Sequence, residues 1–377
     1  MGSTQTIIIV VEICESLWSN PQDKKMMKKY YQIKRRQFIK LSSLALSGSI
    51  FTACSQSDST SSNSQSAEST EKLDKVKFLL SWKAEAEYGG FYQALATGIY
   101  RQHGLDVTIQ PGSPQTNGTQ LLMGGVVDFT MGGAVDAIEA IEQGIPKITI
   151  ASIFQKEIQV LLTHPGVGND SFEQLKGKPI YLSAGVHYWP VIKAKYGLSD
   201  EQKRPYNFNV SPFLVDKNSA QQGLLTSEPY TIEKEGGFKP NILLLADVGY
   251  NPYAFTIETT KKLVETSPDL VQRFVDASIK GWYSYLENPQ PGNELIKNDN
   301  PEMSQDLIDY GLNKLKAYEV IISGDAKTLG IGAMNDQRWE TLFKDLVAVG
   351  IFDAKTDYKQ AYTLNFVNKG LDYYKNP

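Results

Sequence analysis

The chain has 377 residues, with 38 basic and 42 acidic side chains and a formal net charge of −4 at pH 7. This balance lacks the basic excess of proteins that bind nucleic acid, so we expect no nucleic-acid partner. The two cysteines are Cys14 and Cys54, so no disulfide or cysteine-based metal site is expected after Cys54. The length after that point suits two lobes of ~100–200 residues each.

Residues 34–54 have the layout of an export signal. Arg35 and Arg36 precede a short apolar run that ends at Ala53, and Cys54 follows. A charged start, a short apolar middle and small residues before a cleavage point are typical of a signal peptide. The apolar run is too short to span ~30 Å of hydrocarbon as a helix. We therefore predict that residues 1–53 are removed as an export signal.

Residues 1–25 fit no part of that signal, so the position at which translation starts stays open. A signal of ordinary length would begin at Met26 or Met27, and an extended basic region is the alternative. After the signal, residues 54–73 are rich in serine and almost free of apolar side chains. Such a segment buries too little surface to offset its ordering entropy, so we expect a flexible tether.

Phe51-Thr52-Ala53-Cys54 resembles the lipobox of bacterial lipoproteins, with Phe51 where Leu is usual. In those proteins the cysteine is acylated and becomes the first residue of the mature chain. The segment KRRQFIK before the apolar run resembles a twin-arginine signal, and a plain basic start for the general export route remains open. Either route predicts a lipoprotein anchored through Cys54 on the extracytoplasmic, periplasmic side of a membrane.

Strands and helices alternate in the first half of the body. Strands are expected at 75–82, 105–109, 126–131, 148–154 and 159–163, because apolar residues alternate there or form short buried runs. Helices are expected from Phe91 to Ile99 and over 134–143, the second ending before Gly144. Strands separated by helices predict parallel pairing with right-handed crossovers.

A second unit is expected to begin near Ser171. Strands are predicted at 180–183 and 210–215, with a helix over 187–196 between them. The last third of the chain is predicted to be mainly helical. One amphipathic helix begins at Ser267-Pro268, with proline at its favoured first position, and another ends before Gly350.

Several segments together resemble the NMT1/THI5-like substrate-binding proteins of ABC importers. The resemblance begins with SWKAEAEYGGFYQALATGIYRQHGLDVTI at residues 81–109, in which an aromatic residue ends the first strand and Gly-Phe-Tyr follows. It continues through GGVVDFTMGGA at 124–134, LKGKPI at 175–180 and SEPY at 227–230, and so covers the whole mature body.

The resemblance implies an α/β, two-lobed periplasmic-binding-protein fold of type II. It has parallel-rich sheets, helices on both faces and a ligand cleft between the lobes. We expect residues 74–164 and 255–377 to form the first lobe and residues 165–254 the second. The chain would cross between lobes near Thr163–Gly166 and again near Tyr250–Phe255.

Ligands of open α/β sheets bind beyond the carboxyl ends of the strands, which selects a set of candidate side chains. Aromatic residues at these ends offer flat walls for a planar ligand, and Gly132, Gly133 and Ser183 precede helices whose free N–H groups can bind a carbonyl or an anion. The resemblance implies a place in the cleft for Trp82, Tyr88 and Glu228. The predicted ligand-binding residues are Trp82, Glu85, Tyr88, Gly132, Gly133, Ser183, His187, Tyr188, Trp189, Glu228, Tyr230, Tyr250 and Tyr253.

Acidic residues favour one class of ligand over another. Glu85, Glu87 and Glu228 fall at the predicted cleft edges, where Lys83 is the only basic residue. An anion receptor would be expected to offer arginine or lysine, whereas a carboxylate suits an amine donor such as an aminopyrimidine. We therefore expect a small planar nitrogenous solute related to thiamine-pyrimidine precursors, with a sulfonate, taurine or nitrate receptor as the alternative.

Enzymatic functions find little support in the sequence. His103, His164 and His187 are scattered, with no HExxH motif, no GxSxG elbow and no P-loop. Fungal pyrimidine-forming enzymes of the THI5 type use a cysteine-rich segment, and this chain has no cysteine after Cys54. We expect a monomeric binding protein, without catalytic residues, cofactor or metal, that delivers its solute to an ABC permease.

Overall fold

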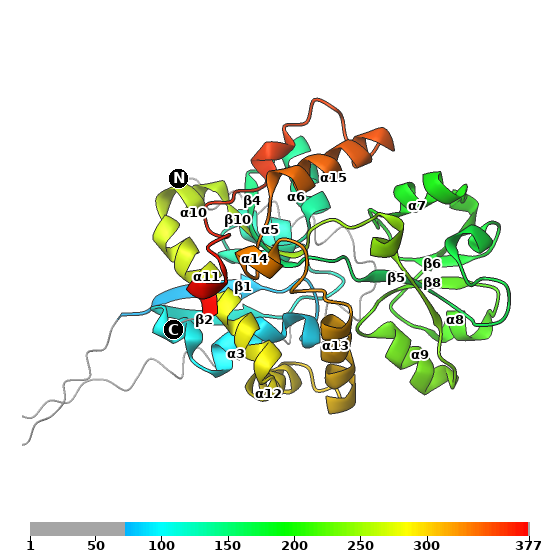
Figure 1. The fold of residues 1–377 in the computed structure, drawn as a ribbon, viewed down its shortest axis with the longest axis horizontal. Coiled ribbons are helices and arrows are strands. Elements are labelled where there is room, and N and C mark those ends of the chain that lie inside the picture. The colour runs from blue at the N-terminus through cyan, green and yellow to red at the C-terminus, as the bar shows by residue number, and fades with distance from the viewer. Residues whose placement is uncertain (1–71, 376–377) are drawn as a thin grey trace, which may run out of the picture. The chain divides into compact units, whose positions relative to one another are not determined.

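The computed structural model describes residues 72–375, so the predicted export signal, Cys54 and nearly all of the expected tether lie outside the described residues. The described part contains two five-stranded sheets (Figure 1). None of its helices is long and apolar enough to span a membrane.

The first sheet has the strand order β2-β1-β3-β10-β4. Its strands are β1 (Asp74–Leu79), β2 (Leu105–Gln110), β3 (Phe129–Gly132), β4 (Lys147–Phe154) and β10 (Ala254–Thr260). β1 pairs in parallel with β2 and β3, whereas β10 runs antiparallel between β3 and β4. We call this sheet and the helices packed on it the first lobe.

The second sheet has the order β7-β6-β8-β5-β9 and forms the second lobe. Its strands are β5 (Gln159–Thr163), β6 (Ile180–Leu182), β7 (Lys203–Pro205), β8 (Ala220–Leu224) and β9 (Asn241–Leu244). β6 pairs in parallel with β7 and β8, and β5 is antiparallel to β8 and β9. Both sheets are therefore mixed, and the expectation of mainly parallel pairing is wrong for β5 and β10.

The strand pairing also moves one expected boundary. Residues 159–163 were expected in the first lobe, but β5 pairs with β8 and β9 of the second sheet. The chain thus leaves the first sheet through residues 155–158, rather than near Thr163–Gly166, and returns through residues 245–253. The physical reason is that four residues suffice to connect β4 to a strand of the other sheet, so no crossover helix separates them.

The helices up to Val248, in the return crossing, alternate with the strands. They are η1 (Ala86–Tyr88), α3 (Gly89–Ala96), α4 (Ile99–Gln102), α5 (Gly118–Met123), α6 (Ala134–Glu142), η2 (Phe172–Leu175), α7 (Trp189–Tyr196), η3 (Asp200–Gln202), α8 (Ser211–Val215), α9 (Glu228–Gly236) and η4 (Leu245–Val248). Residues 211–215 were expected to continue a strand but form α8. Pro212 in its first turn favours a helix start, and only Phe213 of this short helix is buried.

The helices after the return crossing all follow β10. They are α10 (Lys261–Thr266), α11 (Pro268–Glu287), α12 (Gln290–Asp299), α13 (Gln305–Ala317), α14 (Ala326–Leu329), α15 (Asp336–Ala348), η5 (Tyr358–Ala361) and α16 (Leu371–Lys375). α11 lies along α3 (Figure 1), and close packing there depends on glycine. A Cβ atom on Gly90 would lie 2.2 Å from the Trp282 ring, and one on Gly89 would lie 2.1 Å from the Tyr285 ring.

Candidate functional site

The candidate site is a cavity of about 130 Å³ between residues of the first and second lobes. The first lobe contributes the loop after β1 and the start of α6. The second lobe contributes the segment before α7, the start of β5 and the end of β8, and the two crossings complete the wall. The lining residues are Ser81, Gly132, Gly133, Ala134, Val135, Asp136, Glu157, Gln159, His187, Leu224, Tyr250, Pro252, Tyr253, Ala254 and Phe255.

Both crossings are held in place by hydrogen bonds. The backbone N–H of Glu157 donates to Asn251 Oδ1 at 2.8 Å, which ties the outgoing crossing to the returning one. The Arg338 guanidinium from α15 donates to the carbonyls of Gln155 and Asn251 and lies 4.1 Å from the centre of the Tyr253 ring. The crossings therefore form a connected wall behind the cavity.

Glu157 places a carboxylate in the cavity wall. Its side chain is 5% exposed, and Oε1 accepts the backbone N–H groups of Ile158 and Gln159 at 2.9 Å each. Burial raises the pKa of Glu157 to about 7, although the two N–H donors favour the charged form. At neutral pH this carboxyl group can thus either accept or donate a hydrogen bond.

Gly132 and Gly133 shape the opposite wall for different reasons. A Cβ atom on Gly132 would lie 2.4 Å from the carboxylate of Glu258, which forms a buried ion pair with Lys147 at 2.7 Å. Gly133 precedes α6, whose first turn carries Asp136. The glycine pair thus allows β3 to pass the buried ion pair and places the N-terminus of α6 at the cavity.

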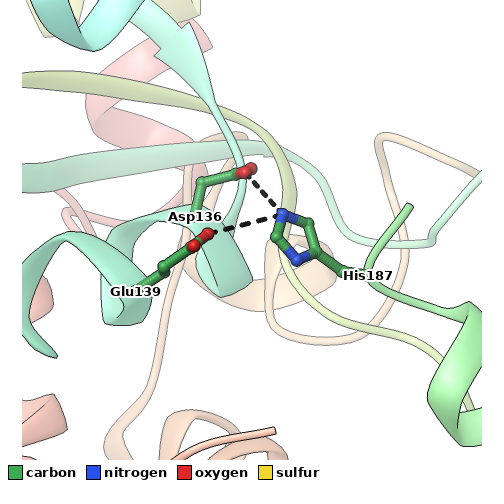
Figure 2. Close-up of side chains that lie close together, drawn as sticks. All are labelled: Asp136, Glu139 and His187. Carbon is green, nitrogen blue, oxygen red and sulfur yellow. Dashed lines mark hydrogen bonds and ion pairs between the residues drawn. The ribbon is translucent and has the colours of Figure 1, made fainter. Parts of the chain in front are cut away.

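His187 reaches across from the second lobe to α6 (Figure 2). Its Nε2 lies 2.9 Å from Asp136 Oδ1 and 3.8 Å from Glu139 Oε2. The hydrogen bond to Asp136 raises the pKa of His187. Desolvation by the surrounding lobes opposes ionisation of Asp136, which is about half exposed, but its bond to His187 brings the pKa below the ordinary value. The hydrogen bond thus favours the charged forms of both groups and connects the two lobes at the edge of the cavity.

Of the residues predicted from sequence, the structure brings Gly132, Gly133, His187, Tyr250 and Tyr253 to the cavity wall. Tyr250 is 5% exposed and packs against Tyr188, with ring centres 6.1 Å apart. Tyr253 donates its hydroxyl hydrogen to Asp325 Oδ2 at 2.9 Å. These two tyrosines supply the aromatic part of the wall.

Three other predicted residues, all of the first lobe, do not line the cavity. The Trp82 ring is tilted against Phe208 of the second lobe, with centres 4.6 Å apart. Tyr88 is buried, and its hydroxyl group shares a hydrogen bond with Ser81 Oγ at 2.9 Å. Burial, followed by the charges of Glu87 and Glu228, raises the pKa of Glu85 well above its ordinary value.

Glu228 uses its carboxylate within the second lobe. Oε2 accepts the Leu224 N–H at 2.7 Å and the Ser227 hydroxyl at 2.6 Å, and Oε1 accepts the Tyr206 hydroxyl at 3.2 Å. Its neighbour across the lobes is Glu87, which accepts a hydrogen bond from Thr226. Glu228 thus organises the start of α9 rather than the cavity wall.

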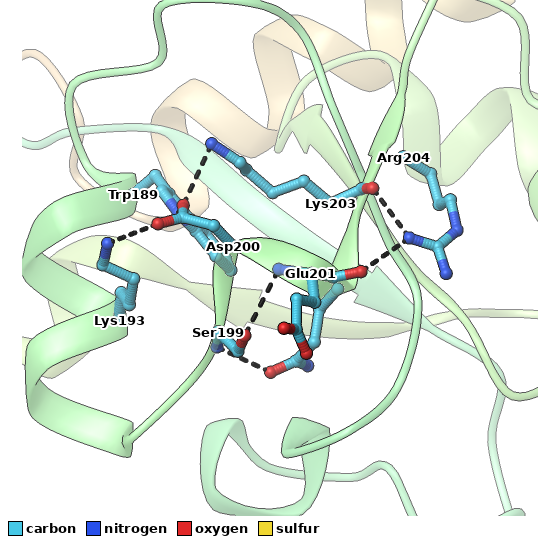
Figure 3. Close-up of polar contacts among 8 residues, drawn as sticks. Trp189, Lys193, Ser199, Asp200, Glu201, Lys203 and Arg204 are labelled. Atoms are coloured by element: carbon cyan, nitrogen blue, oxygen red, sulfur yellow. Dashed lines mark hydrogen bonds and ion pairs between the residues drawn. The ribbon is translucent and has the colours of Figure 1, made fainter.

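The other predicted residues of the second lobe lie away from the cavity wall. Ser183 donates its backbone N–H to Gln222, Tyr188 is fully buried, and Tyr230 packs beside Tyr310. Trp189 donates Nε1–H to Asp200 Oδ1 at 2.7 Å, and Asp200 also pairs with Lys193 and Lys203 (Figure 3). Trp189 therefore belongs to a polar cluster that joins α7 to β7.

Sequence reasoning missed Asp136 and Glu157. Asp136 follows Gly132-Gly133 by one helical turn, and that position at a helix start beside a cleft could have marked it. Glu157 stands in the four residues between β4 and β5, which resemble an ordinary turn in the sequence. Only the assignment of those strands to different sheets shows that this turn is a wall of the cavity.

Comparison with known proteins gives relatives of two kinds. The riboflavin-binding protein RibY of Chloroflexus aurantiacus is 26% identical over 79% of this chain and 87% of its own length. The formylaminopyrimidine-binding protein of Halalkalibacterium halodurans is 23% identical over 66% and 77%. The pyrimidine phosphate synthase THI11 of Saccharomyces cerevisiae is 24% identical over 59% and 74%.

Solved structures agree on the architecture. The periplasmic aliphatic sulphonate binding protein SsuA of Escherichia coli matches with a TM-score of 0.59 and 11% identity, over 76% of this chain and 91% of that one. The expected two-lobed α/β fold is confirmed. The family model described as NMT1/THI5 like matches residues 85–291, more than half of the chain. The chain therefore belongs to the NMT1/THI5-like family, as its sequence motifs indicated.

Proposed function

We propose that the protein is the extracytoplasmic solute-binding component of an ABC importer and that it captures a small planar nitrogen heterocycle. The observation that carries the proposal is the composition of the cavity wall. Glu157 and Asp136 offer carboxylates, and Tyr250 and Tyr253 offer aromatic surface. Among the described residues that line the cavity there is no arginine or lysine, and their one basic side chain, His187, is bonded to Asp136. Such a wall suits ring and amine N–H donors better than a sulfonate or nitrate.

The volume of the cavity narrows the class of solute. An enclosed apolar cavity of about 150 Å³ accommodates benzene. The 130 Å³ here can therefore hold a single six-membered ring, and because this cavity is open to solvent a larger solute would extend out of it. The relatives are named for riboflavin, which has three fused rings, and for a formylaminopyrimidine, which has one. We infer that this cavity can enclose an aminopyrimidine, whereas part of a flavin would remain outside it.

Export and anchoring complete the proposal. The signal at residues 1–53 would direct the chain out of the cytoplasm, and acylation of Cys54 would hold the monomeric receptor beside its permease. Replacing Cys54 by Ser is expected to release the protein from membranes without altering solute binding. Fractionation of cells that express the variant tests the anchor separately from the receptor.

The binding test begins with a thermal-shift screen of residues 55–377 against aminopyrimidines, flavins, purines, sulfonates and nitrate. The best ligand is then titrated by calorimetry into wild type and Glu157→Gln. A hydrogen bond to a charged group contributes about 1.5–3 kcal/mol, so for an aminopyrimidine we expect affinity to fall at least about tenfold.

Glu228→Gln is the matched control, because Glu228 does not line the cavity, and its effect should be small. Selective binding of a sulfonate or nitrate, with affinity unchanged or improved in Glu157→Gln, would refute the heterocycle proposal. The similarity to THI11 makes a pyrimidine-forming enzyme the alternative. The described residues contain no cysteine, and recovery of the bound solute unchanged would support the receptor.

A further inference from the structure

Two carboxylates and one imidazole meet at the edge of the cavity. Asp136 and Glu139 lie three residues apart on α6, so they share one face of the helix. His187 comes from the second lobe, just before α7, and its ring points between the two carboxylates (Figure 2). One ligand atom from each residue can be chosen so that all lie within 4.8 Å of one another.

The spacing of these atoms suits a transition metal ion. Bonds of about 2.1 Å in a tetrahedral zinc site place the ligand atoms roughly 3.4 Å apart. His187 Nε2 lies 2.9 Å from Asp136, the length of their hydrogen bond, and 3.8 Å from Glu139. An ion would therefore displace the proton of that hydrogen bond to solvent and move the His187 and Asp136 atoms about 0.5 Å further apart. Imidazole favours zinc and its neighbours in the first transition row over magnesium or calcium, which prefer oxygen ligands throughout.

The surroundings leave the carboxylates available to an ion. The positive charge of Lys147 lowers the pKa of both Asp136 and His187. Its ammonium group, however, lies 2.7 Å from Glu258 in a buried ion pair. The side chains of His187, Asp136 and Glu139 are 31%, 48% and 42% exposed, so solvent can reach them. Asp136 and His187 also line the cavity, and a fourth ligand position is therefore accessible from it.

We propose that Asp136, Glu139 and His187 bind one zinc-type divalent ion that connects the first lobe to the second. The expectation of no metal site rested on the wide separation of the histidines in the sequence. The fold instead brings one histidine to two carboxylates of the other lobe. The ion would favour the closed arrangement of the lobes, and its open position would accept water or a donor atom of the solute. The proposal does not depend on which solute is bound.

Calorimetric titration of residues 55–377 with zinc chloride alone tests the site. We expect one ion per chain, with affinity at least tenfold weaker in His187→Ala and also in Glu139→Gln. His103→Ala is the matched control, because His103 is bonded to the Ile99 carbonyl within the first lobe and should not change zinc binding. Magnesium chloride should produce no comparable heat.

Two further measurements distinguish this site from a zinc ion bound elsewhere. Zinc should reduce the radius of gyration of wild type in solution scattering but not that of His187→Ala. The ion can bridge the lobes only when the second lobe contributes His187. Cobalt should give the visible absorption of a tetrahedral site in wild type and lose it in Glu139→Gln. Absence of zinc binding, or equal affinity in wild type and both site variants, would overturn the proposal.

Discussion

Glu157 shows how one carboxyl group can link the pH to the stability of this protein. Its pKa is about 7 in the folded chain because the group is buried, compared with about 4.3 when exposed. Between these two values the folded state binds the additional proton. The contribution of Glu157 to the free energy of unfolding is therefore largest at low pH and decreases as pH rises through 7.

We predict that Glu157→Gln stabilises the solute-free protein at pH 8 relative to wild type, because the amide needs no proton to remain neutral in the wall. The pKa shift of Glu157 corresponds to up to about 3 kcal/mol in the free energy of unfolding. The difference in that free energy between the variant and wild type should shrink towards pH 4. Urea unfolding across this range measures it. Glu265→Gln, at an exposed position, is the control, and a pH-independent difference for Glu157→Gln would contradict the prediction.

The sequence predicted the backbone segments that form the cavity better than it predicted which carboxylates face into it. Gly132, Gly133 and the tyrosines of the return crossing follow from strand ends and glycine pairs. The direction of a carboxylate does not, because it depends on which donors are nearby. Glu228 was expected to face a ligand, yet the N–H of Leu224 and the hydroxyl groups of Ser227 and Tyr206 surround it.

At the scale of elements, the close contact between α3 and α11 depends on glycine residues, which have no side chain. Gly281 of α11 and Gly90 of α3 face each other, and a Cβ atom on Gly281 would lie 2.3 Å from the Gly90 carbonyl oxygen. We predict that Gly90→Ala destabilises the protein by about 1–3 kcal/mol, the usual cost of overpacking a core.

Denaturant unfolding of the Gly90→Ala variant measures that loss. Ala96→Ser is the matched control, since Ala96 is exposed at the end of the same helix and its replacement should change stability by less than about 0.5 kcal/mol. Equal stability of Gly90→Ala and wild type would show that the two helices can separate without cost.

The cluster around Asp200 predicts a second effect at this scale. Hydrogen bonds from Lys193, Trp189 and Lys203 hold the pKa of Asp200 well below its usual range. The stability that it contributes is present above its unfolded pKa of about 3.9 and is lost as pH falls below that value. Asp200→Asn should therefore lower Tm at pH 7 and less so in high salt, and the difference should be smaller at pH 3, because the contribution is lost gradually as pH falls from the unfolded pKa towards the lower folded one.

Thermal unfolding at the two pH values and two salt concentrations checks this prediction. Glu201→Gln is a suitable control, because the neighbouring side chain takes no part in the cluster. A Tm loss as large at pH 3 as at pH 7 would show that Asn strains the segment instead of removing an ionic contact.

Elements with a clear period were predicted well, whereas short segments were not. The amphipathic pattern of α11 and the apolar runs of β4 and β5 agree with the structure. The segment Val210–Val215 was expected as a strand from its apolar residues, but Pro212 and the packing of Phe213 select a single helical turn. Periodicity over five or six residues cannot separate these two outcomes.

At the scale of the whole molecule, we propose that the lobes rotate about the two crossings, residues 155–158 and 245–253. A solute held by both lobes should shift the open and closed populations towards closed. We predict a smaller radius of gyration with solute and a stabilisation of about 2.7 kcal/mol at a hundredfold excess over Kd. A ligand that raises Tm without changing the solution scattering would contradict this mechanism.

The family motifs were enough to predict two lobes, but not which strands complete each sheet. Alternating strands and helices suggest parallel order, and nothing in residues 254–260 marks them as partners of β3 and β4. Their insertion is decided by tertiary packing, since β10 fills the space between two strands that precede it by a hundred residues or more.

That insertion determines when the first sheet can form during synthesis. Every backbone pairing of β4 in the described chain involves residues after 253: the β10 ladder and the bridges to Gly332 and Tyr362. The apolar strand KITIASIF therefore leaves the ribosome long before its neighbours exist, while the second sheet, contiguous from 159 to 244, can already assemble. Until β10 arrives, β4 has an unpaired edge that is prone to aggregation, and a chaperone that covers it would protect the nascent chain.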